Sequence, residues 1–213
     1  MSNKENQLND LKEIRQLMDR SSRFLSLSGM SGVAAGVCGI GSAIFTHFYL
    51  SKEGLRSTFE SYAFIEVELE KRVITNLLLI GAITLALAIA SATFFTLRKA
   101  TKSKQKIWDA TTKRLFINML LPLGAGGIFC LALLYHNEYG LVAPATLVFY
   151  GLALLNASKY TLDEMRYLGI TEIVLGLVAM FNVGYGLEFW AVGFGLMHIV
   201  YGLVMWYKYD RKG

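Results

Sequence analysis

The stretch VITNLLLIGAITLALAIASATFFTL, residues 73–97, lies between Arg72 and Arg98 and contains no Asp, Glu, Lys or Arg. A helix needs about 20 consecutive apolar residues to cross the hydrocarbon core of a bilayer, so this stretch is long enough to span one. Residues 24–51 form a second uncharged stretch of similar length. These two stretches predict an integral membrane protein.

The composition of the whole chain points the same way. Of the 213 residues, 54% are hydrophobic and 17% are charged, and the mean hydropathy is +0.43. Soluble domains contain about 25% charged residues. A soluble enzyme, a disordered tail and a disulfide scaffold are therefore disfavoured. Cys38 and Cys130 both lie inside apolar stretches, where small packing residues are expected.

Charged residues divide the chain into six predicted spans. These are residues 24–50, 73–97, 115–136, 139–158, 167–185 and 188–207. Very short links join the third span to the fourth and the fifth to the sixth, which predicts helical hairpins. We expect an all-α, polytopic membrane protein with six transmembrane helices arranged as three parallel hairpins. A β-barrel is disfavoured, because barrel strands alternate over about ten residues and do not form long apolar runs.

The distribution of Lys and Arg predicts the orientation in the membrane. One side carries seventeen of the 21 basic residues, in segments 1–23, 98–114, 159–166 and 208–213. The other side carries Lys52, Arg56, Lys71 and Arg72. Because cytoplasmic loops are rich in Lys and Arg, both termini are expected in the cytoplasm and the protein in the inner membrane. The net charge of +5 is then an orientation signal, and no nucleic-acid partner is expected.

Two segments outside the spans have patterns of their own. Residues 7–20 have apolar side chains at helical spacing, so residues 1–22 are predicted to form a cytoplasmic amphipathic helix, with the transmembrane domain covering 23–213. This helix would rest on the inner leaflet or the bundle, or dock a partner. In loop 51–72, residues 65–70 alternate as a strand would, but a lone strand has no partner, so a helical extension of the second span is favoured.

The second half of the chain contains an internal repeat. Leu123-Gly124 and Leu175-Gly176 are 52 residues apart, and Tyr150-Gly151-Leu152 parallels Tyr201-Gly202-Leu203 at a shift of 51. With the run Glu172-Ile173-Val174-Leu175-Gly176-Leu177, this pattern resembles the small six-helix, short-repeat membrane proteins that include the HdeD acid-resistance protein. The resemblance covers residues 114–209 and implies a stress-related membrane protein without enzyme chemistry. The chain departs from that family in loop 51–72, in its N-terminal helix and in lacking a proline near Asn182.

Small residues mark the predicted helix-packing positions. Ser28, Gly32 and Gly36 are spaced by four on one face of the first span, which allows close helix approach. The face would pack within the chain or, alternatively, against a second copy. The full set of predicted helix-packing residues is Ser28, Gly32, Gly36, Gly124, Gly176 and Gly202.

Glu172 and His198 are the candidate site residues. Glu172 interrupts the fifth span and His198 lies near the middle of the sixth, at depths of about 8 and 14 Å from the rise per residue. Ionisable residues inside spans are costly and face the bundle interior or a wet cavity. The two could form a structural hydrogen-bonded pair, be satisfied separately, or relay protons or bind a cation. Asn118, Asn156 and Asn182 are expected to line the same interior.

The sequence therefore predicts a non-enzymatic membrane component with a structural, stress-related or partner-binding role. The alternative is a small transporter or channel that uses the Glu/His pair. The expected partners are the lipid bilayer and a second copy or another membrane protein. No catalytic residue, cofactor or metal site is predicted, because no nucleophile or ligand motif is present.

Overall fold

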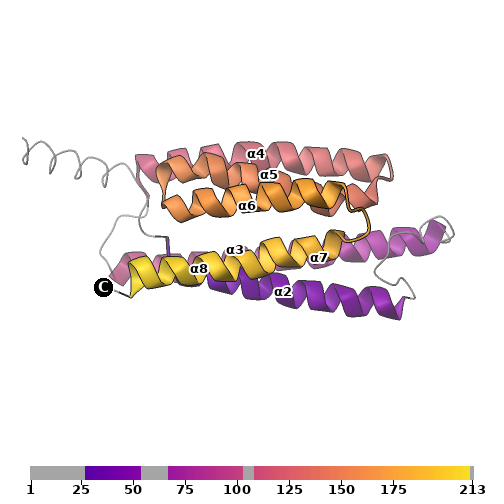
Figure 1. The fold of residues 1–213 in the computed structure, drawn as a ribbon, viewed down its shortest axis with the longest axis horizontal. Helices are drawn as coiled ribbons and strands as arrows, with labels where there is room; N and C mark the ends of the chain where they lie inside the picture. The colour runs from indigo at the N-terminus through magenta and orange to yellow at the C-terminus, as the bar shows by residue number, and fades with distance from the viewer. Residues whose placement is uncertain (1–26, 54–66, 103–107, 212–213) are drawn as a thin grey trace, which may run out of the picture.

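The computed structural model describes residues 27–53, 67–102 and 108–211 (Figure 1). These residues form helices joined by short turns, and no strand occurs among them. The all-α prediction is confirmed for this part of the chain. The predicted amphipathic helix over residues 7–20 lies outside the described residues.

Five long helices are followed by one composite helix. The long helices are α2 (Gly29–Lys52), α3 (Val67–Lys102), α4 (Ala110–Tyr135), α5 (Val142–Ala157) and α6 (Asp163–Met180). The composite helix comprises α7 (Gly186–Trp190), the π-helical turn η4 (Ala191–Met197), α8 (His198–Met205) and the π-helical turn η5 (Trp206–Asp210). We call this composite, residues 186–210, the final helix. Short 3-10 turns, η2 (Tyr139–Leu141) and η3 (Ser158–Tyr160), flank α5.

Five of these helices are long and apolar enough to cross a membrane. They are Gly29–Lys52, Lys71–Lys102, Ala110–Tyr135, Tyr139–Tyr160 and Gly186–Asp210. Of the predicted fifth span, 167–185, residues 167–180 belong to α6, which begins at Asp163 and ends at Met180, and residues 181–185 form the turn that follows. α6 is outside the set of five, and it carries Asp163, Glu164, Arg166 and Glu172 within 18 residues. The helical extension of the second span is confirmed from Val67 onward.

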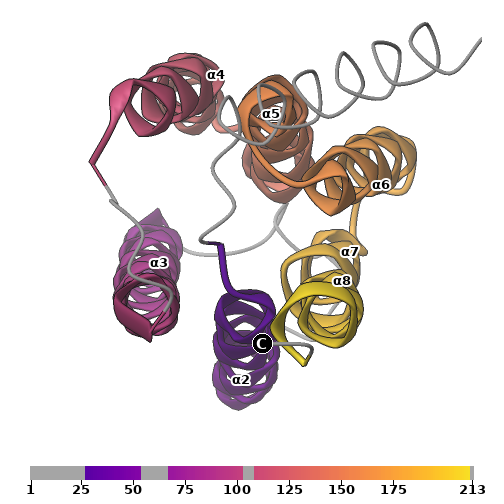
Figure 2. The same cartoon turned by 90° about the vertical axis from the view of Figure 1, so that its left-hand side faces the viewer.

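Successive helices run in opposite directions along the long axis of the molecule (Figure 1), and they lie in an arc when viewed from the end (Figure 2). The order in space is α3, α2, the final helix, α6, α5 and α4. The first two predicted hairpins are observed as packed pairs, α2 with α3 and α4 with α5. The third is looser than expected: α6 packs mainly on α5, and the final helix packs mainly on α2.

The face of α2 with small residues packs on the final helix. A Cβ added to Gly36 would lie 2.6 Å from the carbonyl oxygen of Gly195, and one on Gly32 would lie 3.1 Å from Cα of Gly202. The final helix of the same chain therefore occupies the surface that a second copy would have needed. Gly124, by contrast, has nothing within 4 Å of its Cβ position, so the structure gives it no packing role among the described residues.

Asp210 ties three helices together at one end of the molecule. Its Oδ2 accepts hydrogen bonds from Ser28 Oγ at 3.1 Å and Gly29 N at 2.9 Å, at the first turn of α2. Its Oδ1 lies 2.8 Å from Lys99 Nζ on α3. Ser28 thus makes a buried polar contact at the start of α2. The negative charge of the Asp210 carboxylate there interacts favourably with the positive end of the helix dipole.

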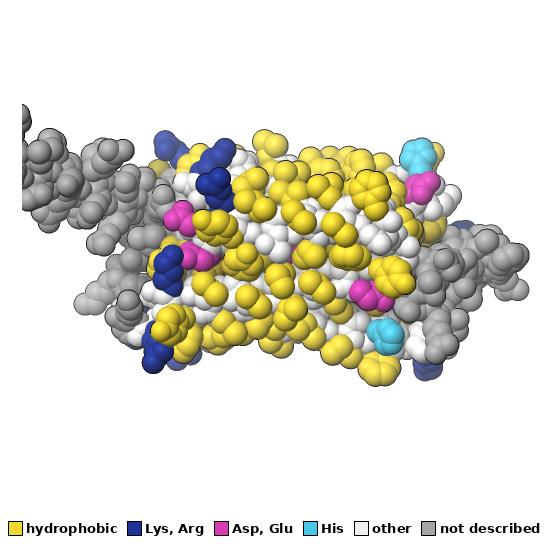
Figure 3. Space-filling model, in the orientation of Figure 1, with side chains coloured by type: hydrophobic (Ala, Val, Ile, Leu, Met, Phe, Trp, Pro, Cys, Tyr) yellow, Lys and Arg dark blue, Asp and Glu magenta, His cyan; other side chains and the backbone are white. Residues whose placement is uncertain are grey.

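Apolar side chains cover the flanks of the bundle, and cations gather at its ends (Figure 3). On the face shown, most Lys and Arg side chains lie at the end that holds Asp210 and the C-terminus. Large apolar side chains such as Ile83 on α3 and Ile128 on α4 are 60% and 72% exposed. Such a surface would aggregate in water and suits a bilayer.

Candidate functional site

The candidate site lies where α6, α5 and the final helix meet. Glu172, on α6, is fully buried, and His198, the first residue of α8, is 6% exposed. His198 Nδ1 is 3.4 Å from Glu172 Oε1. The structure therefore brings together the two ionisable residues that the sequence singled out.

Hydrogen bonds fix the tautomer of His198. Its Nδ1 lies 3.0 Å from the carbonyl oxygen of Gly193, which can only accept, so Nδ1 carries a hydrogen. Its Nε2 lies 2.8 Å from the hydroxyl of Tyr150. In neutral imidazole Nε2 is then the acceptor, and Tyr150 donates. The ring is thus held at both nitrogens.

Tyr150 is the third member of the site. In the sequence it stands out only as part of the repeated Tyr-Gly-Leu motif. It lies on α5, and its ring is stacked near His198, with centroids 5.4 Å apart. Phe194 is 4.9 Å from Tyr150 and 5.9 Å from His198, between ring centroids. A tyrosine in an apolar span is ordinary, so only the fold reveals that its hydroxyl meets the imidazole. We call Tyr150, His198 and Glu172 the polar triad.

A π-helical turn shapes the final helix at this point. η4 contains Gly193, whose absent side chain leaves room for Glu172: an added Cβ would clash with Glu172 Oε2 and lie 2.6 Å from Leu147 Cδ2. Single π-helical turns often occur at functional sites. In η4 the turn presents the Gly193 carbonyl to His198 and leaves the Glu172 carboxyl against the glycine.

The carboxyl group of Glu172 is unusually isolated. Neither of its oxygens has a hydrogen-bond partner among the described residues, although both are buried. α5 brings no Asp, Glu, Lys or Arg, and the final helix brings no cation before Lys208, which follows His198 by about 15 Å of helix. Arg166, on α6 itself, precedes Glu172 by about 9 Å of rise. Among the residues that the structure describes, His198 is therefore the closest group able to balance a charge on Glu172.

The other predicted polar residues lie elsewhere. Asn156 Nδ2 donates to the backbone oxygen of Asn118 at 2.9 Å, which links α5 to α4, and Asn118 Nδ2 donates to Arg114 O at 2.8 Å. Asn182 is exposed after α6 and donates to Val178 O at 2.8 Å. The expectation that the three asparagines line one interior with Glu172 is wrong for Asn182. Each of the three asparagine side chains donates a hydrogen bond to a backbone carbonyl oxygen.

Gly176 and Gly202 lie in close helix contacts on opposite sides of the site. A Cβ on Gly176 would lie 2.9 Å from Pro144 O, so α6 approaches α5 closely there. A Cβ on Gly202 would lie 2.6 Å from Val33 N, so the final helix approaches α2. The two contacts seat α6 on one neighbour and the final helix on another, which sets the position of the triad between them.

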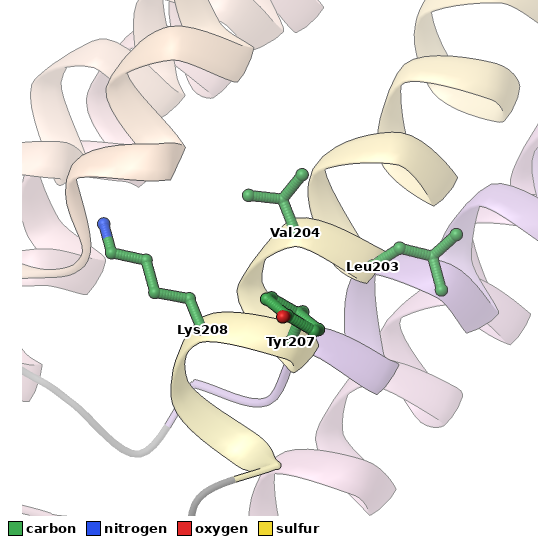
Figure 4. A pocket seen from close by; sticks show the side chains of 4 residues that line it. All are labelled: Leu203, Val204, Tyr207 and Lys208. Carbon is green, nitrogen blue, oxygen red and sulfur yellow. The ribbon is translucent and has the colours of Figure 1, made fainter.

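A shallow groove lies at the cation-rich end of the final helix (Figure 4). Leu203, Val204, Tyr207 and Lys208 line it. Lys208 Nζ is 2.7 Å from Glu164 Oε1, so this end of the final helix is tied to α6. The groove and the polar triad are separate features, because the groove begins five residues after His198 on the helix surface.

Comparison with known proteins gives no relative: no family model, no curated protein and no solved structure matches the chain. The resemblance to the HdeD-type proteins therefore stays a prediction. Within the described residues no three His, Cys, Asp or Glu side chains lie together as a metal-binding group.

Proposed function

We propose that the protein is an inner-membrane component without enzymatic activity that binds a second copy or another membrane protein through α3 and α4. Stress physiology is the setting that the sequence resemblance implies. Both termini would lie in the cytoplasm, because the described end with most cations (Figure 3) holds both the start of α2 and the end of the final helix. A lipid bilayer would surround the apolar flanks.

The observation that carries this proposal is the position of α3 and α4 at the two ends of the arc (Figure 2). α3 packs mainly on α2, and α4 mainly on α5. Both helices consequently expose large apolar residues along most of their length, such as Ile83 and Ile128. Helices in membranes associate through van der Waals packing, and α4 adds the small, exposed Gly124 to its free surface.

Site-specific photo-crosslinking in membranes tests the proposal. A photoreactive phenylalanine analogue would replace Ile83 on α3 or Ile128 on α4, with Val174 on α6, which is 53% exposed, as the matched control. We expect protein adducts from the first two positions and lipid adducts from Val174. Adducts of twice the chain mass identify a second copy. Lipid adducts at all three positions would contradict the proposal.

A second candidate function, proton or cation handling, has one specific observation in its favour. The buried Glu172 carboxyl has no hydrogen-bond partner among the described residues and lies beside His198. Buried ionisable residues in membrane helices often mark ion or proton pathways. Full burial of Glu172 weighs against an open pore at this point, so any transport would need the helices to move.

Reconstitution into liposomes separates the two candidates. For a proton carrier, we expect flux above that of protein-free liposomes, and we expect Glu172→Gln to abolish it. Glu188→Gln, which changes an exposed carboxylate near the start of the final helix, is the control and should leave flux intact. Equal leakage from liposomes with and without the protein would remove the transport candidate.

A further inference from the structure

We propose that Tyr150, His198 and Glu172 form a buried proton-binding site in which the Glu172–His198 pair holds a single exchangeable proton. The ligand of the site is the proton itself. The proposal concerns binding inside the folded chain, and it stands whether or not the protein transports protons or binds a partner through α3 and α4.

The charge balance of the Glu172–His198 pair favours a single proton. A carboxylate buried in apolar surroundings without partners costs several kcal/mol, and so does an isolated imidazolium. The Glu172 oxygens have no hydrogen-bond partner among the described residues, and His198 Nδ1 is 3.4 Å from one of them. A pair with one proton is neutral overall, whereas a pair with none or two carries a net charge in the core.

The neighbouring elements bring no other group that could take over this role. The titratable residue of α5 is Tyr150, and those of α7, η4 and α8 besides His198 are Glu188 and Tyr201. Glu188 lies near the start of the final helix, ten residues before His198, and the Tyr201 hydroxyl lies 3.2 Å from Thr171 Oγ1. α6 carries the other charges, Asp163, Glu164 and Arg166, in its first turn.

Two arrangements of the proton satisfy this balance. In the first, Glu172 is a carboxylic acid, His198 is neutral with its hydrogen on Nδ1, and the Tyr150 O–H donates to Nε2. In the second, Glu172 is a carboxylate, and His198 is an imidazolium whose Nε2–H donates to Tyr150 Oη. The two arrangements hold the same number of protons and are both neutral overall: the first has one proton on Glu172 and one on Nδ1, and the second has one on each nitrogen of the imidazole. Tyr150 serves both arrangements because a hydroxyl can donate or accept.

Spectroscopy on the full chain in lipid nanodiscs tests the site. His47 and His136 are exposed, so replacing both with Asn leaves His198 as the sole histidine and the core intact. Nitrogen NMR then distinguishes neutral from charged His198, and infrared spectra show a protonated Glu172 as a carboxylic acid band that Glu172→Gln removes. We expect one of these two signatures, and not both, without change between about pH 5 and 8, where a free histidine titrates.

Three results would overturn the proposal: neither signature at neutral pH, which means no proton on the pair; both signatures together, which means two protons; or titration of His198 like a free imidazole. The histidine measurement needs no change to Glu172, so it remains informative if Glu172→Gln fails to fold. Tyr150→Phe tests the third member and should shift the Nε2 resonance. Tyr201→Phe, in the neighbouring α6 contact, is its control and should not. Equal spectra for both variants would exclude Tyr150 from the site.

Discussion

Gly193 places its backbone directly against the Glu172 carboxyl. A methyl group at this position would clash with Oε2 of Glu172 and with Leu147 on α5. Overpacking of a tight core costs about 1–3 kcal/mol. We expect Gly193→Ala to lower the stability of the detergent-solubilised protein by about that amount, measured by thermal unfolding.

Gly127→Ala provides the control for this substitution. Gly127 lies on α4, and no atom lies within 4 Å of its Cβ position among the described residues. Alanine there should be neutral or stabilise the helix by about 0.5–1 kcal/mol. Equal losses of stability at the two sites would show that Gly193 is not a point of close packing.

Asp109 begins α4 as its N-cap. Its Oδ1 accepts hydrogen bonds from Thr112 N at 2.7 Å and from Thr112 Oγ1 at 2.8 Å. The backbone hydrogen bond from Thr112 is the main cause that lowers the pKa of Asp109 below its usual value. Asp109→Ala should cost about 1 kcal/mol at neutral pH, the typical value of an N-cap.

The pH dependence of this cap follows from the sign of its pKa shift. Because the pKa is lower in the folded state, the stabilisation is present above the unfolded pKa of about 3.9 and is lost as pH falls through the folded pKa. The stability difference between the parent and Asp109→Ala should shrink accordingly in thermal unfolding at acid pH. Asp109→Asn, which keeps an accepting oxygen but no charge, should retain most of the cap without this pH dependence.

At the scale of helices, the sequence predicted which segments would be helical better than which of them would touch. Charged borders located the long apolar helices, since a long uncharged run favours a helix. The sequence predicted less well which helices pack together: the final helix packs mainly on α2, and only secondarily beside α6. Gly32 and Gly36 predicted a close contact, but no local pattern names the partner helix.

The contact between α2 and the final helix gives a prediction at this scale. A Cβ on Gly36 would lie 2.6 Å from Gly195 O, whereas Gly41 on the same helix has nothing within 4 Å of its Cβ position. We expect Gly36→Ala to destabilise the protein by about 1–3 kcal/mol and Gly41→Ala to be neutral or slightly stabilising. Unfolding of both variants in one detergent gives the comparison, and equal melting temperatures would contradict the assigned interface.

The polar triad shows where sequence analysis stops. Glu172 and His198 stand out because charged and histidine residues are rare in apolar helices, and their depths along neighbouring spans predicted that they could meet. Tyr150 and Gly193 do not stand out, because tyrosine and glycine are common in such helices. Their roles depend on the π-helical turn η4 and on the rotation of α5, which are set by packing across the bundle and not by any local pattern.

The proposed membrane arrangement requires all six helices to cross the membrane, each in the direction opposite to the one before. This includes α6 with its four charged residues. The cation-rich end would face the cytoplasm, and the end that holds Lys52 would face outward. α6 would cross because α5 and the final helix cover Glu172, while Asp163, Glu164 and Arg166 lie in its first turn at the cation-rich end. If α6 lay on the membrane surface and did not cross, the final helix would start on the cytoplasmic side and run outward. Six crossings require it to start outside and end at the cytoplasmic side.

Cysteine accessibility in intact cells tests this arrangement most directly. In a background without Cys38 and Cys130, single cysteines would replace five exposed residues at or near the ends of successive helices: Lys52, Lys113, Glu138, Lys159 and Glu188. We expect a membrane-impermeant maleimide to label positions 52, 138 and 188 from outside, and positions 113 and 159 only after lysis. Labelling of position 159 from outside, or of position 188 only after lysis, would contradict the six-helix membrane arrangement.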